Sequence, residues 1–284
     1  MNKSIETLAL AGMLLLANSV GAQDKNFYVF LCLGQSNMEG FPGIEDQDRS
    51  PGDSRFQVLA TVDFQTPERK AGNWYPAVPP LCRPSAGLCP ADFFGRSLVA
   101  QLPKEIKVGV VNVAVAGCKI ELFDKQNYSS YAATAPEWMK TAIAAYDGNP
   151  YQKLVDMGRV AQKSGVIKGI LLHQGESNTG DEQWPAKVRA VYMNLLKDLD
   201  LKAEEVPLIA GEVVGTDQKG LCASMNQIIA RLPTEIPTAH IVSSKGCVVR
   251  SDNLHFSPEG YRELGRRYAQ AMLPLLGHDS ARVK

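Results

Sequence analysis

An apolar stretch that ends abruptly at a glycine is the feature that most constrains the fold of this chain. Residues 27–33 form a run of β-forming side chains, and Gly34 then permits a sharp turn that a Cβ atom would obstruct. A polar Gln-Ser-Asn segment follows at 35–37. In α/β sheets ligands bind outside the carboxyl ends of parallel strands, so Ser36 stands where a nucleophile would be presented. Serine also caps helices and forms turns, and this segment alone leaves both interpretations open.

Strand-like and helix-like segments alternate along the rest of the chain. Residues 108–115 are almost continuously apolar, as expected of a parallel strand covered on both faces, and residues 182–199 carry apolar side chains at helical spacing. Further strands are expected at 166–172, 207–213 and 240–243, and further helices at 91–101, 136–146, 151–163, 221–232 and 257–272. Five strands joined by helical crossovers predict an α/β fold, a three-layer α/β/α sandwich around a five-stranded parallel sheet.

The segment between the first strand and the first helix, residues 41–89, is long, irregular and rich in Pro, Gly and Asp. Loops of this length in compact domains are usually functional. Trp74 is the candidate contribution of this loop to a binding surface. The alternative interpretation is that Trp74 only packs the loop against the core.

The first 22 residues have the pattern of a secretory signal. Lys3 provides a weakly basic start, residues 8–16 an apolar core, and residues 20–22 a small-residue cleavage site. The apolar core is too short to span a membrane. We therefore expect one domain over residues 23–284, exported to the periplasm or the extracellular space without membrane insertion.

The charge balance argues against a nucleic-acid partner. The 30 Lys and Arg residues equal the 30 Asp and Glu residues, so the chain lacks the basic surface that such partners require. The four histidines are scattered and no CxxC or HxxxH spacing occurs, so we expect no metal site. Six cysteines in an exported protein make disulfides plausible, and the pairs Cys82 with Cys89 and Cys222 with Cys247 are candidates, although sequence alone does not fix connectivity.

Asp252 and His255 are an acid and a histidine three positions apart, just ahead of the last expected helix. Side chains at this spacing share a face in any helical turn. A carboxylate there can accept the Nδ1 proton of His255 and leave Nε2 free as a general base. The alternative is that Asp252 is a turn residue and His255 an ordinary surface side chain.

Two other strand ends carry candidate groups for an oxyanion hole. Residues 173–176 read His-Gln-Gly-Glu, where Gln174 can donate an amide N–H and Glu176 can orient a base or bind substrate hydroxyls. Gly117 follows the second expected strand, and its backbone N–H can serve as another donor. Each such donor is typically worth ~3–4 kcal/mol at the transition state. The alternative for residues 173–176 is a tight turn whose polar groups bond one another.

Four blocks of this sequence, in order, resemble the conserved blocks of the SGNH hydrolases. They are Gly-Gln-Ser-Asn-Met at 34–38, Val-Ala-Val-Ala-Gly at 113–117, His-Gln-Gly-Glu-Ser at 173–177 and Asp-Asn-Leu-His at 252–255. More narrowly, they resemble the sialate O-acetylesterase and family-six carbohydrate esterase branch, over residues 27–272. The resemblance implies a flavodoxin-like α/β/α fold and the hydrolysis of acetyl esters on carbohydrates without a cofactor.

The resemblance also implies roles for particular residues. Ser36 is expected to be the nucleophile, His255 the base and Asp252 its acid. The amides of Ser36 and Gly117, with Gln174 as a third donor, are expected to hold the oxyanion.

Two positions depart from the wider superfamily. Gln35 replaces the aspartate of its Gly-Asp-Ser block, and Gln174 stands where it has an asparagine. Both are normal in the narrower branch. That branch also carries Glu176, which leaves Glu176 open as an alternative acid or as a substrate contact.

The expected substrate is an acetylated carbohydrate, with acetylated xylan favoured and an O-acetylated sialic acid as the alternative. We expect Gln35, Asn37 and Trp74 to contact it. A carbohydrate-binding relic of the fold would lack a catalytic residue, and none is missing. A lipase of the same superfamily would show an exposed apolar lid, and the long loop contains no such run.

Overall fold

A seven-stranded sheet forms the centre of the computed structural model, which describes residues 23–41 and 43–278. Its strand order is β5-β2-β6-β1-β7-β8-β9. The five expected strands are all present and parallel, and they are β1 (Asp24–Gly34), β6 (Lys107–Ala114), β7 (Gly165–His173), β8 (Leu208–Gly211) and β9 (Ala239–Val242). The predicted signal segment, residues 1–22, lies outside the described residues and stays a prediction.

The expected strand number of five is too low, because the long loop contributes two more. β2 (Phe56–Leu59) pairs in parallel with β6, and β5 (Trp74–Pro76) pairs antiparallel with β2 at the edge of the sheet. β3 (Phe64–Gln65) and β4 (Glu68–Arg69) form a separate two-stranded ribbon. These strands are two to four residues long. Such lengths carry too little periodicity to be recognised in a sequence.

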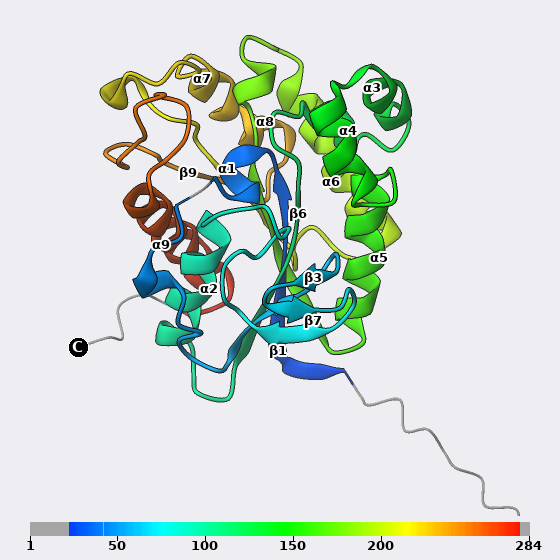
Figure 1. Ribbon diagram of the computed structural model, residues 1–284, viewed down its shortest axis with the longest axis vertical. Coiled ribbons are helices and arrows are strands. Elements are labelled where there is room, and N and C mark those ends of the chain that lie inside the picture. Colours follow the sequence, from blue (N-terminus) through cyan, green and yellow to red (C-terminus); the bar gives the residue numbers. More distant parts are fainter. Residues whose placement is uncertain (1–22, 42, 279–284) are drawn as a thin grey trace, which may run out of the picture.

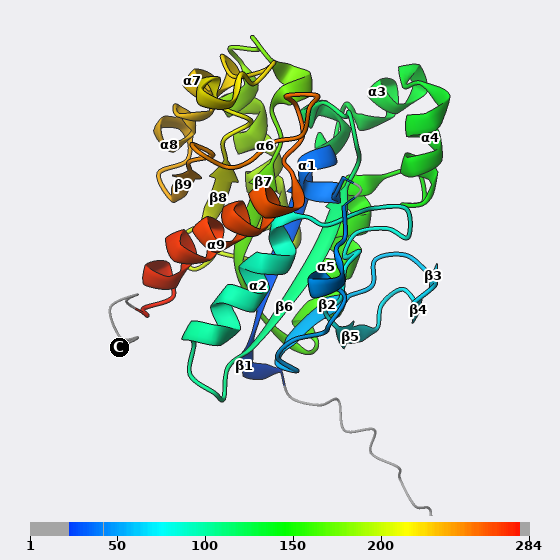
Figure 2. The ribbon, with the colours of Figure 1, turned by 60° about the vertical axis from the view of Figure 1, so that its left-hand side comes forward.

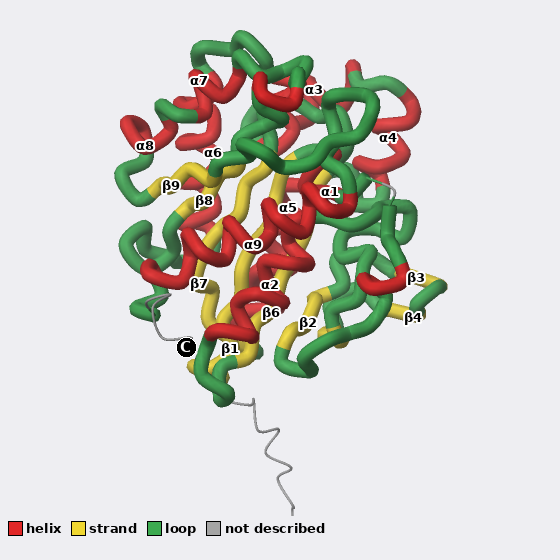
Figure 3. Tube along the Cα trace, turned by 90° about the vertical axis from the view of Figure 1, so that its left-hand side faces the viewer, coloured by secondary structure: helices red, strands yellow, loops and turns green. Residues whose placement is uncertain are grey.

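Helices cover both faces of the sheet and complete the predicted three-layer sandwich. Figure 1 shows the sheet between two groups of helices, and Figure 3 shows α2 and α9 crossing one face together. The pair α2 (Pro90–Gln101) and α9 (Pro258–Leu275) packs on β6, β8 and β9. On the other face α5 (Pro150–Gln162) packs on β1, β6 and β7, beside α6 (Trp184–Asp198). No helix within the described residues is both long enough and apolar enough to cross a bilayer.

The shorter helices lie at the carboxyl end of the sheet. The expected helix at 221–232 is divided into two, because Pro233 has no N–H with which to continue the hydrogen-bond ladder. These helices are α1 (Ser36–Glu39), α3 (Tyr128–Thr134), α4 (Glu137–Ala144), α7 (Met225–Ile229) and α8 (Leu232–Glu235), with single 3₁₀ turns η1 (Asp46–Asp48), η2 (Ile120–Phe123), η3 (Glu176–Asn178) and η4 (Thr216–Gln218).

The six cysteines, all within the described residues, are free thiols, so neither candidate disulfide is formed. Cys82 Sγ lies 3.0 Å from the hydroxyl of Tyr146, and Cys89 Sγ accepts a hydrogen bond from Asn112 Nδ2 at 3.6 Å. Burial raises the pKa of the Cys82 thiol to about 12. These thiols behave as small buried side chains with partners of their own.

The ends of three central strands are level with one another. Gly34 pairs with Ala114 on one side and with His173 on the other. The polar segments that follow β1, β6 and β7 therefore meet at one edge of the sheet. In Figures 1 and 2, α1 lies at this edge between α4 on one side and α7 on the other.

Candidate active site

Ser36 lies on a tight turn at the carboxyl end of β1. Gly34 ends the strand with a φ of +153°, and a Cβ atom there would lie 2.0 Å from the carbonyl oxygen of His173. Only glycine fits that approach. The N–H of Gln35 donates to the same carbonyl at 3.1 Å, and Ser36 then begins α1. The structure thus places Ser36 beyond the strand end, as the sequence predicts.

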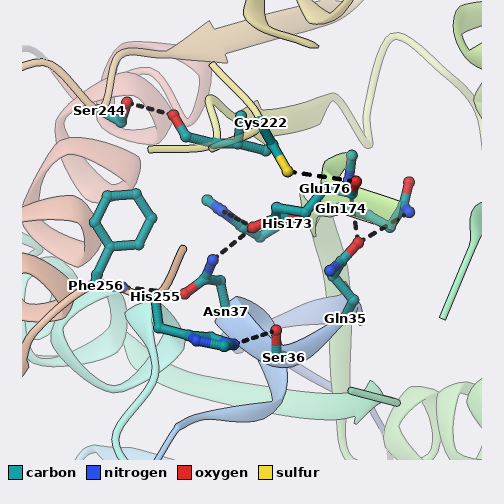
Figure 4. A network of polar contacts seen from close by, with 12 residues as sticks. Gln35, Ser36, Asn37, His173, Gln174, Glu176, Cys222, Ser244, His255 and Phe256 are labelled. Carbon is teal, nitrogen blue, oxygen red and sulfur yellow. Dashed lines mark hydrogen bonds and ion pairs between the residues drawn. The ribbon is translucent and has the colours of Figure 1, made fainter. Parts of the chain in front are cut away.

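Asp252 and His255 lie on a turn that faces Ser36. The two Asp252 oxygens divide their roles. Oδ1 accepts hydrogen bonds from the backbone N–H of Leu254 at 2.9 Å and of His255 at 3.0 Å, and Oδ2 lies 2.9 Å from His255 Nδ1. On the other side of the ring, His255 Nε2 lies 3.0 Å from Ser36 Oγ (Figure 4). A proton on Nδ1 leaves the Nε2 lone pair directed at the serine hydroxyl.

The local backbone makes the Asp252 carboxylate a stable anion. Partial burial raises the pKa of Asp252, but hydrogen bonds from the backbone and ring of His255 and from the Leu254 N–H outweigh it, so the pKa falls below its ordinary value of 3.8. Asn253, which follows Asp252, has a φ of +53°, a conformation that asparagine adopts more readily than most residues. Asp252 is therefore ionised at neutral pH.

Phe41 supports the histidine ring from one face. The Phe41 and His255 rings are stacked, with centroids 4.0 Å apart and planes inclined by 15°. The guanidinium of Arg250 lies over the Phe41 ring, 4.9 Å from its centroid. The stack restrains the orientation of the imidazole. Phe41 has no sequence signal of its own, because it is the first residue of an irregular segment.

Two backbone N–H groups flank the serine. Gly117 has a φ of +66°, and its carbonyl accepts a hydrogen bond from Ser177 Oγ at 2.9 Å. The preceding N–H, of Ala116, donates to Glu39 Oε2 at 2.5 Å. In the part of the chain that the structure describes, neither the Ser36 N–H nor the Gly117 N–H has an acceptor. These two donors are free to bind an oxyanion.

The Glu39 carboxylate joins α1 to this loop and to the 82–89 segment. Its other oxygen accepts a hydrogen bond from Arg83, and both side chains are largely buried. Burial raises the pKa of Glu39, although the positive charge of Arg83 and the Ala116 N–H oppose the rise. Sequence analysis missed this ion pair, although Glu39 lies on the same short helix as Ser36.

An open pocket of about 470 Å³ lies over these groups. Its walls combine the polar strand ends with apolar side chains from α4 and from several loops. Among the described residues, no group of three or more His, Cys, Asp or Glu side chains is arranged to hold a metal ion. The lining residues are Gln35, Ser36, Phe41, Ala116, Gly117, Trp138, Glu176, Ser177, Leu221, Cys222, Leu254 and His255.

Residues 26–274 match the model of a protein family described as carbohydrate esterase, sialic acid-specific acetylesterase. The chain belongs to this family. A probable carbohydrate esterase of Arabidopsis thaliana is 24% identical over 258 residues, which cover 86% of this chain and 90% of the plant protein. The resemblance to the sialate O-acetylesterase branch of the SGNH hydrolases is confirmed, and the protein is a serine esterase.

Solved structures agree with the fold of this esterase. The X-ray structure of the Arabidopsis thaliana protein has a TM-score of 0.66 at 23% identity, covering 87% of this chain and 98% of that one. The structure of NanS has a TM-score of 0.66 at 16% identity, and the match covers 90% of this chain and 99% of NanS. A carbohydrate acetylesterase from Xanthomonas citri has a TM-score of 0.58 at 18% identity, and the match covers 86% of this chain and 55% of the Xanthomonas citri chain. The predicted α/β/α arrangement is confirmed.

Gln174 of this esterase does not have the role that the sequence suggests. Its amide nitrogen donates to Gln35 Oε1 at 3.1 Å, to the Cys118 carbonyl at 3.2 Å and to Asn178 Oδ1 at 2.7 Å. Its amide oxygen accepts from the Trp184 indole. The side chain is buried and fully engaged, which contradicts its assignment as an oxyanion donor. Gln174 braces the loop after β7.

Asn37 is also occupied within the protein, whereas Gln35 uses its amide oxygen there and still lines the pocket. Gln35 Oε1 accepts hydrogen bonds from Gln174 Nε2 at 3.1 Å (Figure 4) and from the Ser177 N–H at 3.2 Å. Asn37 Nδ2 donates to Glu176 Oε1 at 2.5 Å and to the Leu254 carbonyl at 3.1 Å. The structure therefore corrects Asn37 from a substrate contact to an internal brace, and the expected contact between Gln35 and the substrate stays a prediction.

Glu176 is not in contact with the His255 ring, whose acidic partner is Asp252. One Glu176 oxygen accepts from Asn37 and lies 3.8 Å from His173 Nε2, while Oε2 is buried without a hydrogen-bond partner. Burial raises the pKa of Glu176 to about 7. Of the two candidate acids, only Asp252 has the geometry of a triad member.

His173 is a structural residue of the same network. Its Nδ1 lies 3.3 Å from the hydroxyl of Tyr268, which itself donates to the Leu172 carbonyl at 2.7 Å. Burial lowers the pKa of His173 to about 3. The ring is therefore neutral and does not serve as a second base.

Trp74 lies far from the pocket. It packs on Phe27, with ring centroids 4.7 Å apart, and against the backbone of Gly109. Both neighbours are near the amino ends of their strands. Gly109 precedes the end of β6 at Ala114 by five residues, a span of roughly 17 Å in a strand. The expected role of Trp74 in substrate binding is wrong, and its alternative role as a core contact is correct.

The raised pKa of Glu176 predicts a pH-dependent stability. The folded protein holds this proton more tightly than the unfolded chain, so the free energy of unfolding falls as the pH rises from 4.5 to about 7 and stays low above it. Over that pH interval the free energy of unfolding falls by at most about 3 kcal/mol on account of Glu176. Replacing Glu176 with Gln should reduce the difference in unfolding free energy between pH 5 and pH 8, measured by urea denaturation.

Glu105→Gln is the matched control, because Glu105 is exposed. Burial also raises the pKa of Asp92 to about 7. Every variant therefore retains the part of the pH dependence of stability that Asp92 contributes. A Glu176→Gln protein with the full slope of the wild type would contradict the assignment.

Proposed function

We propose that this esterase removes acetyl groups from carbohydrate hydroxyls with Ser36 as nucleophile, His255 as general base and Asp252 as its acid. The observation that carries the proposal is the unbroken chain of contacts from Ser36 Oγ to His255 Nε2 at 3.0 Å and from His255 Nδ1 to Asp252 Oδ2 at 2.9 Å. A serine becomes a useful nucleophile at neutral pH when an adjacent base accepts its proton. Membership in a carbohydrate esterase family supports the acetylated sugar as substrate.

In the first step the serine oxygen attacks the acetyl carbonyl carbon while His255 Nε2 accepts the hydroxyl proton. The carbonyl oxygen becomes an anion, and the N–H groups of Ser36 and Gly117 stabilise it. The bond from the acetyl carbon to the sugar oxygen then breaks. His255 returns its proton to that oxygen, so the sugar leaves as a neutral alcohol.

In the second step water replaces the sugar. His255 takes a proton from the water as its oxygen attacks the acetyl group on Ser36, and the same two N–H groups hold the second anion. The bond to Ser36 Oγ breaks, Ser36 regains its proton and acetate is released. Asp252 remains ionised throughout and keeps the imidazole in the required tautomer.

We propose an acetylated neutral polysaccharide, such as xylan, as the substrate in preference to an O-acetylated sialic acid. None of the described residues that line the pocket is Lys or Arg, and Glu176 among them is an acid. Arg250 lies over Phe41 and lines a neighbouring hollow. A sugar carboxylate in the pocket would lack the cationic partner that such groups require.

Ser36→Ala should lower kcat for a small chromogenic acetate by at least about 10⁴-fold, because the covalent step is lost. Ser54→Ala, at an exposed serine, is the matched control and should retain wild-type kinetics. Initial rates over the same substrate range measure both. Substantial residual activity in Ser36→Ala would refute the assignment of the nucleophile.

Asp252→Asn should lower kcat by about 10³–10⁴-fold, because the ring would no longer be held in the required tautomer. Glu176→Gln should cost much less, since its amide oxygen can still accept the Asn37 hydrogen bond. The comparison uses the same chromogenic acetate. If the Glu176 change alone were severe, the acid would be Glu176 and the role given to Asp252 would be wrong.

The wild-type enzyme should have a kcat/KM for acetylated xylo-oligosaccharides at least about tenfold above that for 9-O-acetylated sialic acid, a difference of about 1.4 kcal/mol in transition-state binding. Acetate release from each substrate at low ionic strength measures the ratio. A ratio that favours the sialic acid would support the sialate esterase alternative.

A further inference from the structure

Two large apolar side chains are exposed at the mouth of the catalytic pocket. Trp138 is 58% exposed and Leu221 is 71% exposed, and both line the pocket that contains Ser36 and His255. A single exposed apolar side chain is ordinary on a protein surface. Two that border one pocket are typical of a ligand-binding groove.

Trp138 is held beside the Gly117 loop. It lies in the first turn of α4, and a Cβ atom on Gly117 would be only 2.7 Å from Trp138 Cη2. The edge of the six-membered ring therefore touches the backbone whose N–H is proposed to bind the oxyanion. An indole placed there contacts whatever part of the substrate lies next to the reacting carbonyl.

Leu221 forms the facing wall from a different part of the chain. Its N–H donates to the carbonyl of Asn253 at 3.1 Å, which ties Leu221 to the turn that carries Asp252 and His255. Figures 1 and 2 show that α4, and the segment leading into α7, lie on opposite sides of α1. Both side chains line the pocket that contains Ser36, one carried by α4 and the other by the segment before α7.

A pyranose ring has the shape and chemistry that this pair of walls accommodates. Its two faces carry C–H groups that pack on an aromatic plane, while its hydroxyls point outward from the rim. Tryptophan offers a large, rigid contact surface at low cost in conformational entropy. The pocket supplies no lysine or arginine for an acidic sugar, so the fitting ring is uncharged.

We propose that Trp138 is the sugar-binding platform of this esterase, with Leu221 as the opposing wall, and that they hold a neutral pyranose while its acetyl group reaches Ser36. The inference rests on the proposed function and specifies how its substrate is recognised. The sequence suggested Trp74 as the tryptophan that contacts the substrate. Trp138 of α4 is the tryptophan that lines the pocket.

The test compares an acetylated methyl xyloside with ethyl acetate, an acetyl ester without a ring. Trp138→Ala should lower the ratio of kcat/KM for the xyloside to kcat/KM for ethyl acetate about tenfold, because only the xyloside uses the platform. Trp138→Phe, which retains an aromatic face, should give an intermediate ratio. Met193→Ala, at an exposed apolar residue of α6 outside the pocket, should leave the ratio at the wild-type value.

An unchanged ratio in Trp138→Ala would overturn the proposal. So would an equal loss on both substrates, because Trp138 would then act only through the Gly117 loop. If Trp138→Ala fails to fold, Leu221→Ser offers a second variant at a largely exposed position and should lower the ratio several-fold. An unchanged ratio in Leu221→Ser would contradict the proposed role of Leu221 as the opposing wall.

Binding separates this proposal from the proposed function. Ser36→Ala should bind the intact acetylated xyloside, measured by calorimetry, and the double variant with Trp138→Ala should bind it about tenfold more weakly. This outcome supports the platform whether or not Ser36 is the nucleophile. Equal affinities in the two proteins would overturn the platform even if the esterase mechanism were correct.

Discussion

The contact between the turn after β1 and the end of β7 is the constraint on which the site depends. Gly34 approaches the carbonyl of His173 so closely that a Cβ atom would lie 2.0 Å from its oxygen, and the Gln35 N–H bonds to that carbonyl. The pairing of β1 with both β6 and β7 brings the three strand ends level. Ser36 therefore follows the central strand of the sheet, which is paired on both sides.

A buried polar network then joins the serine helix to the histidine turn. Asn37 donates to Glu176 and to the Leu254 carbonyl, and its oxygen accepts from the Phe256 N–H at 3.3 Å and the Tyr261 hydroxyl at 2.9 Å. Satisfied polar networks of this kind specify one arrangement of the segments they connect. The residue next to Ser36 thus positions the turn that carries His255, although 219 positions separate the two catalytic candidates.

The long strands and the motifs were predictable, and the short elements and the partners of buried amides were not. An apolar run such as 108–115 reveals a buried strand by itself, whereas β2 is a strand because it pairs with β6, and β5 because it pairs with β2. The interpretation of Gln174 failed for a related reason. An exposed and a fully bonded glutamine look the same in a sequence, and the partners of Gln174 come from the loop at Cys118 and from the first residue of α6, Trp184.

The sequence was sufficient to predict the succession of the main strands and helices, the glycine turn before Ser36 and the pairing of Asp252 with His255, because each depends on neighbours within a few residues. The packing of distant segments was needed to show that Glu176 does not contact the histidine ring and that Trp138, not Trp74, borders the pocket. The sequence left Glu176 open as an alternative acid and suggested Trp74 as a substrate contact. Packing directed one toward Asn37 and the other toward Phe27, since contacts between distant segments follow from how the layers close.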